Sequence, residues 1–165
     1  EHTHKRSMIN PARDEEEIVI FNECLAAGKK MVGICRGAQF LHVMNGGKMF
    51  QHVDGHATGF AHKLTDVSTG NELTVTSTHH QMMRLKEGQG GEVVAVSNES
   101  TQKEFMMGVD EVGIVFNDDV DIEVMWYEDN KCLCFQPHPE FKGADSTYFY
   151  FKNLLASYIG GIYNG

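Results

Sequence analysis

The spacing of apolar residues predicts a helix near the start of the chain. Its apolar positions recur at helical intervals: Ile18, Phe21, Leu25 and, on the flank, Cys24. Asn10 followed by Pro11 is typical of a helix N-cap and first helical residue, and Gly28 is a candidate for the residue that ends the helix. We expect this face to pack against the body of the protein.

The next segments alternate between strand and helix. Residues 31–35 form a short apolar run, as expected of a buried parallel strand. Residues 39–45 are predicted to be a second helix, which Gly46 and Gly47 would stop. An order of helix, strand, turn and helix indicates an α/β protein.

The middle of the chain is predicted to be rich in strands, followed by a closing helix. The expected strands are residues 72–77, 92–97, 113–116, 120–127 and 131–136. Residues 146–159 have the spacing of an amphipathic helix, with an expected inner face of Phe149, Leu154, Leu155 and Tyr158.

Composition narrows the class of protein without naming its function. The 165 residues are 41% hydrophobic and 22% charged, which suits one folded domain. A net charge of −9 without a basic run argues against binding to nucleic acid or to an anionic membrane. No apolar stretch approaches the length of a membrane span. The four cysteines are unevenly spaced, so we expect free thiols in a reducing compartment and a cytoplasmic protein.

Cys35 has the sequence context of a nucleophile. An apolar strand runs into Gly33-Ile34-Cys35-Arg36-Gly37, and a helix is predicted to follow, which is the pattern of a nucleophile elbow with cysteine in place of serine. The helix N-terminus is expected to lower the pKa of the Cys35 thiol and to offer backbone N–H groups to an oxyanion. The alternative interpretation is a buried cysteine before a glycine turn.

A base for this nucleophile is predicted later in the chain. His138 lies between Pro137 and Pro139 after an apolar strand, and Glu140 follows two residues later. A cysteine nucleophile needs a base, and the base needs a group that orients it. Cys35, His138 and Glu140 can fill these three roles, whereas the alternative for His138 is a rigid surface turn.

Five motifs in order resemble one known family. They are residues 33–39, Asn45-Gly46-Gly47-Lys48-Met49-Phe50-Gln51, Ser77-Thr78-His79-His80-Gln81, the strand with Glu123, and Gln136-Pro137-His138-Pro139-Glu140. With them the chain resembles the class I glutamine amidotransferase-like superfamily, and within it the γ-glutamyl hydrolase branch, which is similar to peptidase family C26. The resemblance implies a three-layer, flavodoxin-like α/β fold, with a mostly parallel sheet flanked by helices and an added antiparallel strand section.

The resemblance also implies a reaction and a set of binding residues. Cys35 would attack a γ-glutamyl carbonyl and form a thioester, with His138 as acid and base and Glu140 orienting it. The backbone N–H of Arg36 would supply half of the oxyanion hole. The positions that match the substrate cleft are Arg36, Gly37, Gln39, His79, His80 and Gln81. No cofactor is implied.

Part of the family domain has no counterpart in these residues. Residues 1–165 are expected to be a single domain of this superfamily that lacks its N-terminal strands and the glycine-rich loop with the second oxyanion donor. Either the chain is a fragment or a second polypeptide completes the domain.

A metal site is not expected. His52 and His56 could bind a metal if they were helical, but Gly55 and Gly59 indicate a loop, and no carboxylate or cysteine completes the set. The acidic residues Asp118, Asp119, Asp121 and Glu123 are interpreted mainly as a solvated turn, with Glu123 possible in a strand beside the site.

Three functions remain open. The first is hydrolysis of a γ-glutamyl amide, which Arg36 favours because the synthetase-linked branch more often has an apolar residue there. The second is a glutamine amidotransferase subunit that delivers ammonia to a synthetase or ligase partner. The third is a catalytically silent family member, against which the presence of Cys35, His138 and Glu140 argues.

Overall fold

The computed structural model describes residues 10–57, 59, 61–85, 88–116 and 120–160. The helical elements are α1 (Pro11–Ala26), α2 (Arg36–Met44), α3 (Asp145–Leu154) and a terminal π-helical turn, η1 (Leu155–Ile159). The strands are β1 (Met31–Ile34), β2 (Lys48–Phe50), β3 (His52–Val53), β4 (Ala61–Asp66), β5 (Glu72–Thr76), β6 (Met82–Arg84), β7 (Glu92–Ser97), β8 (Gln102–Gly108), β9 (Glu111–Phe116), β10 (Asp121–Tyr127) and β11 (Cys132–Phe135).

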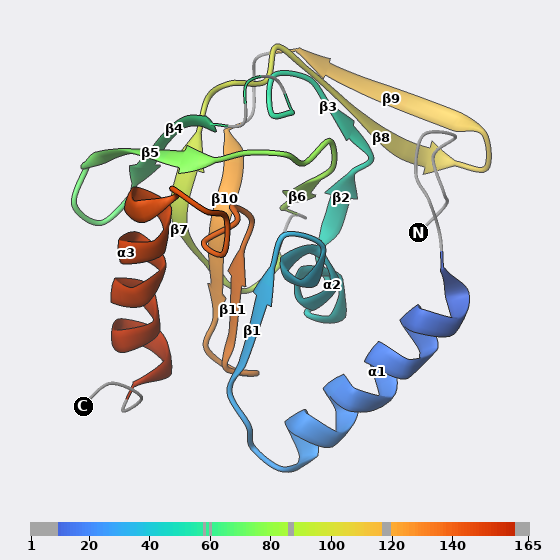
Figure 1. Ribbon diagram of the computed structural model, residues 1–165. Helices are drawn as coiled ribbons and strands as arrows, with labels where there is room; N and C mark the ends of the chain where they lie inside the picture. The colour runs from blue at the N-terminus through green and yellow to red at the C-terminus, as the bar shows by residue number, and fades with distance from the viewer. Residues whose placement is uncertain (1–9, 58, 60, 86–87, 117–119, 161–165) are drawn as a thin grey trace.

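The main sheet has the order β1-β11-β10-β7-β4-β5, and β6 joins it by pairing with β10 and β2. A second sheet, β3-β8-β9, extends away from the first at the upper right of Figure 1. The chain passes from one sheet to the other at Gln51, between β2 and β3.

Helices α2 and α3 cover opposite faces of the main sheet (Figure 1). Side chains alternate along β11, so Cys132 and Cys134 pack toward α2 while Leu133 and Phe135 pack toward α3. The α/β class and its three layers are therefore confirmed, and the expectation that Cys132 belongs to the core is confirmed with them.

The expected mostly parallel order of the sheet is wrong for the described residues. Only β1 and β11 pair in parallel there, and every other pairing is antiparallel. The physical reason lies in the connections, because β10 and β11 are joined by a short turn, which permits only an antiparallel pair.

The first helix begins as predicted but packs differently. The Asn10 side chain accepts a hydrogen bond from the Arg13 backbone N–H at 3.2 Å, and Gly28 follows the helix with φ 61°. Phe21 is buried, but Ile18 and Leu25 are each 40% exposed, so most of the predicted inner face is uncovered.

The closing helix also differs in its inner face. Leu154 is buried as expected, but Phe149 is 61% exposed, and Tyr150 packs against the sheet in its place. Among the described residues, no helix is both long enough and apolar enough to cross a membrane.

Candidate active site

Cys35 lies in a strained turn between β1 and α2. Its φ of 50° and ψ of −111° fall in a region that side chains rarely occupy, as in a nucleophile elbow. A Cβ atom on Gly33 would lie 2.3 Å from the Gly37 carbonyl carbon, so only glycine fits at residue 33. A Cβ atom on Gly37 would meet no atom within 4 Å, so the described structure requires glycine at one of the two positions only.

His138 and Glu140 lie beside this turn because β1 and β11 are parallel neighbours. Ile34 pairs with Phe135 at the ends of the two strands, and the Cys35 backbone N–H donates to the Phe135 carbonyl at 2.9 Å. The loops that follow both strands thus leave the same edge of the sheet. His138 Nδ1 lies 2.7 Å from Glu140 Oε1, which is the geometry of an oriented imidazole.

Other contacts hold the His138 loop in place. The His138 backbone N–H donates to Thr76 Oγ1 at 2.7 Å, and the Thr147 hydroxyl accepts from the Thr76 N–H at 3.0 Å. The His138 ring stacks on Phe141, with centroids 4.4 Å apart. Sequence reasoning missed Thr76 and Thr147, because neither has a motif and both act through the way β5 and α3 pack.

The Cys35 thiol is in its neutral form at rest. Burial raises its pKa, and the Glu140 carboxylate raises it further, whereas the Arg36 backbone N–H lowers it without offsetting burial. The expected lowering of the thiol pKa by the helix N-terminus is therefore wrong in its net direction. The Gln136 side chain donates to Cys35 Sγ at 3.6 Å, a contact that was not anticipated from the motif.

A cavity of about 240 Å³ opens onto Cys35. It is lined by Cys35, Arg36, Gln39 and residues 78–81, so it gathers five of the six predicted substrate-binding residues. Gly37 lies elsewhere, in a separate pocket between α1, β1 and α2. Within the Cys35 cavity, His79 is buried and His80 is exposed.

Two of the predicted binding side chains have partners inside the protein. The Arg36 guanidinium lies 2.5 Å from both Glu17 and Asp14 of α1, so it links α2 to α1. The Gln39 amide donates to the Gln81 carbonyl at 3.0 Å and to the Gln136 side chain at 3.1 Å. Gln39 therefore fixes one wall of the cavity.

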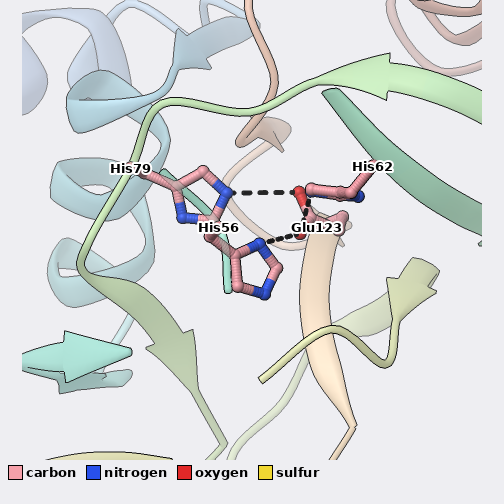
Figure 2. A group of neighbouring side chains, drawn as sticks. All are labelled: His56, His62, His79 and Glu123. Carbon is pink, nitrogen blue, oxygen red and sulfur yellow. Dashed lines mark ion pairs between the residues drawn. The ribbon is translucent and has the colours of Figure 1, made fainter. Parts of the chain in front are cut away.

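A second group of chemically active residues lies behind His79. Figure 2 shows the imidazoles of His56, His62 and His79 gathered around the carboxylate of Glu123. The distances to its oxygens are 3.3 Å from His56 Nδ1, 3.1 Å from His62 Nε2 and 3.7 Å from His79 Nε2. The sequence expectation that no carboxylate lies near His56 is wrong, because β10 places Glu123 there. His52 does not belong to this group.

The acidic stretch before β10 was also misjudged. Asp121 and Glu123 are buried rather than solvated, while Asp118 and Asp119 lie outside the described residues. Burial raises the pKa of each of the two carboxyls. Hydrogen bonds from His56 and Lys103 outweigh burial for Asp121, and the neighbouring His79 and His62 do so for Glu123, so both pKa values are held well below the ordinary range.

Comparison with solved structures supports the fold. A GMP synthase subunit from Thermoplasma acidophilum is 16% identical with a TM-score of 0.54, over 88% of this chain and 69% of that one. A glutamine amidotransferase from Thermotoga maritima is 14% identical with a TM-score of 0.51, over 92% of this chain and 61% of that one.

Comparison of sequences identifies the family. The glutamine amidotransferase-like protein YvdE of Lactococcus lactis is 27% identical over 138 residues, which are 82% of this chain and 56% of YvdE. The chain thus spans little more than half the length of that relative. The sequence profile of the peptidase C26 family matches residues 1–140. Because this match covers most of the chain, the protein belongs to the peptidase C26 family.

Proposed function

We propose that this protein cleaves a γ-glutamyl amide bond through a thioester on Cys35. The observation that carries the proposal is the pair of loops at one sheet edge, with the strained Cys35 on one and the His138–Glu140 pair, 2.7 Å apart, on the other. Membership of the peptidase C26 family supports an amide hydrolase or an amidotransferase.

The proposed reaction follows from the state of the thiol. Because the Cys35 pKa is raised, the thiol keeps its proton until a base removes it, and His138 accepts that proton as sulfur attacks the carbonyl carbon. The Arg36 N–H stabilises the oxyanion. The C–N bond then breaks, the amine leaves with the proton from His138, and water hydrolyses the thioester to glutamate and free thiol.

The cavity supports a small polar substrate. Gln39 and residues 79–81 offer amide, carbonyl and imidazole groups to the ammonium and carboxylate of a glutamyl group. We place the second oxyanion donor in the N-terminal part of the family domain, which these 165 residues do not include. Activity is therefore best tested on the full-length protein.

A second candidate is transfer of the released ammonia to a synthetase partner. It is favoured by the similarity to a protein described as glutamine amidotransferase-like. The chemistry on Cys35 is the same up to the thioester, and the two candidates differ in whether a partner is needed for turnover.

The test is an assay of ammonia, amine and glutamate release from glutamine and from a set of γ-glutamyl amides. We expect turnover that falls by at least about 1,000-fold in Cys35→Ala and is retained in Cys24→Ser, a matched change outside the site. Mass spectrometry of the quenched reaction should find the γ-glutamyl group on Cys35. Turnover of glutamine only with an added synthetase would select the second candidate, and absence of a thioester with every substrate would overturn both.

A further inference from the structure

The group formed by His56, His62, His79 and Glu123, called here the three-histidine cluster, is built from four separate segments. His56 follows β3, His62 lies in β4, His79 lies between β5 and β6, and Glu123 lies in β10. All four residues are buried, with His56 and Glu123 fully enclosed. Four polar side chains from distant parts of the chain are rarely buried together unless something satisfies them.

The outer nitrogen of each imidazole already has an acceptor. These acceptors are Asp121 Oδ2 at 2.9 Å from His56 Nε2, the Lys63 carbonyl at 2.9 Å from His62 Nδ1, and the Gln81 carbonyl at 3.1 Å from His79 Nδ1. Carbonyl and carboxylate oxygens only accept hydrogen bonds, so each outer nitrogen carries the proton. In the neutral rings, the inner nitrogens then present lone pairs to Glu123.

The inner atoms of the three-histidine cluster have no hydrogen bond. His56 Nδ1, His62 Nε2, His79 Nε2 and Glu123 Oε2 are all buried and without a hydrogen-bond partner. Three lone pairs facing an ionised carboxylate repel one another. Protonating all three rings would instead place an excess of positive charge around one carboxylate in a site shielded from water. A single metal cation would satisfy the four groups at once.

We infer that the three-histidine cluster binds one divalent transition-metal ion, and that this ion is Zn²⁺. Its four candidate ligand atoms lie within 4.8 Å of one another. Tetrahedral bonds of about 2.0–2.2 Å would place ligand atoms about 3.4 Å apart, so a small inward shift is sufficient. Imidazole nitrogens with one carboxylate suit zinc better than Ca²⁺ or Mg²⁺, which prefer oxygen ligands.

The surroundings of the cluster match those of a metal site. Metal-bound histidines usually donate their second nitrogen to a carboxylate or a backbone carbonyl, as all three do here. Four protein ligands in a buried site leave no open position for substrate, so the ion has a structural role. It would tie β4 and β10 to the segment of His79, which lines the Cys35 cavity. This inference goes beyond the proposed function and is independent of it.

Metal content is the direct test. We expect tag-free protein, purified without chelator, to hold one Zn²⁺ per chain by inductively coupled plasma mass spectrometry. Glu123→Gln and His62→Asn should each weaken Zn²⁺ binding by at least about 100-fold, and Asp121→Asn, which acts through His56, by about 10- to 100-fold. Cys35→Ser and His80→Ala are matched controls that should keep the full metal content, because neither residue belongs to the cluster.

Co²⁺ added to metal-free protein supplies a second readout. A tetrahedral nitrogen and oxygen site should give visible d–d absorption without a thiolate charge-transfer band. Titration of metal-free wild-type protein with Zn²⁺ keeps the test valid if a variant fails to fold. A Zn²⁺ Kd weaker than about 10 µM, equal binding by Glu123→Gln, or loss of metal in Cys35→Ser would each overturn the inference. None of these results depends on γ-glutamyl cleavage.

Discussion

At the scale of single residues, backbone geometry decides where chemistry can occur. Cys35 has a positive φ that costs about 1–3 kcal/mol in a residue with a side chain, and the surrounding turn must hold it. Gly33 makes that turn possible because its missing Cβ leaves room for the Gly37 and Ala38 backbone. The two glycines of the motif therefore differ in what they do for the turn.

We predict that Gly33→Ala destabilises the protein, whereas Gly37→Ala does not. The new Cβ at residue 33 would lie 2.3 Å from the Gly37 carbonyl and 2.6 Å from the Ala38 nitrogen, and neither backbone atom can move easily. We expect a loss of about 1–3 kcal/mol in the free energy of unfolding. Gly37→Ala lies in the first turn of α2 in open space, so its effect should be within about 1 kcal/mol. Urea unfolding of both variants tests this, and equal midpoints would contradict it.

At the scale of elements, polar residues carry part of the packing. In β4, the buried positions are His62, Leu64 and Asp66, so two of the three inward side chains are polar. A pattern based on apolar residues does not detect such a strand, which explains why β4 was not predicted. Asp66 joins β4 to α3, because its Oδ2 accepts a hydrogen bond from the Tyr150 hydroxyl at 2.7 Å.

We predict that Asp66→Asn lowers stability at neutral pH and reduces its dependence on pH. Burial raises the pKa of Asp66, but hydrogen bonds from Ser68, Tyr150 and Thr69 outweigh it and lower the pKa below the ordinary value. A lowered folded-state pKa contributes stability above the unfolded pKa of about 3.9, and this contribution is lost as pH falls through the folded value.

The experiment is urea unfolding of wild type and Asp66→Asn at about pH 6 and about pH 3, on either side of the unfolded-state pKa. The difference of about 1–3 kcal/mol expected at the higher pH should shrink at the lower one. Tyr150→Phe is the matched control, since it removes one donor and keeps the carboxylate, and it should show an intermediate loss. A difference that does not change with pH would rule out the ionised carboxylate as its source.

At the scale of the whole molecule, one buried ion pair joins the two sheets. Lys103 of β8 lies 2.9 Å from Asp121 of β10, and both side chains are 1% exposed. Asp121 also accepts hydrogen bonds from the Glu99 and Ser100 backbone N–H groups and from His56. The small sheet is therefore tied to the main one at the side of the three-histidine cluster.

We predict that Lys103→Met lowers the free energy of unfolding by about 3–5 kcal/mol, because it leaves a buried carboxylate without its cation. Lys63→Met is the matched control, since Lys63 pairs with Glu72 at 3.0 Å on the surface and its loss should cost at most about 1 kcal/mol. Thermal and urea unfolding of the two variants, both in excess chelator, give the comparison. Similar losses in both would show that the buried pair does not hold the sheets together.

Motifs that are local in the sequence could be predicted, and the structure places them where the sequence suggested. The N-cap at Asn10, the strand before Cys35 and the helix after it all depend on neighbouring residues. The loop with His138 and Glu140 is likewise local, since the two residues are only two positions apart. Their roles in catalysis stay a prediction.

What lies between distant segments was decided only by the tertiary structure. The direction of the strand pairs, the exposed face of α1 and the raised pKa of Cys35 depend on which groups surround each residue after folding. The three-histidine cluster is the clearest case, since His56 and Glu123 are far apart in the sequence and lie in contact only because β10 passes beside the loop after β3. The sequence by itself determined the turn, the nucleophile candidate and the family resemblance. Burial and electrostatics, which depend on neighbours brought together by folding, determined the rest.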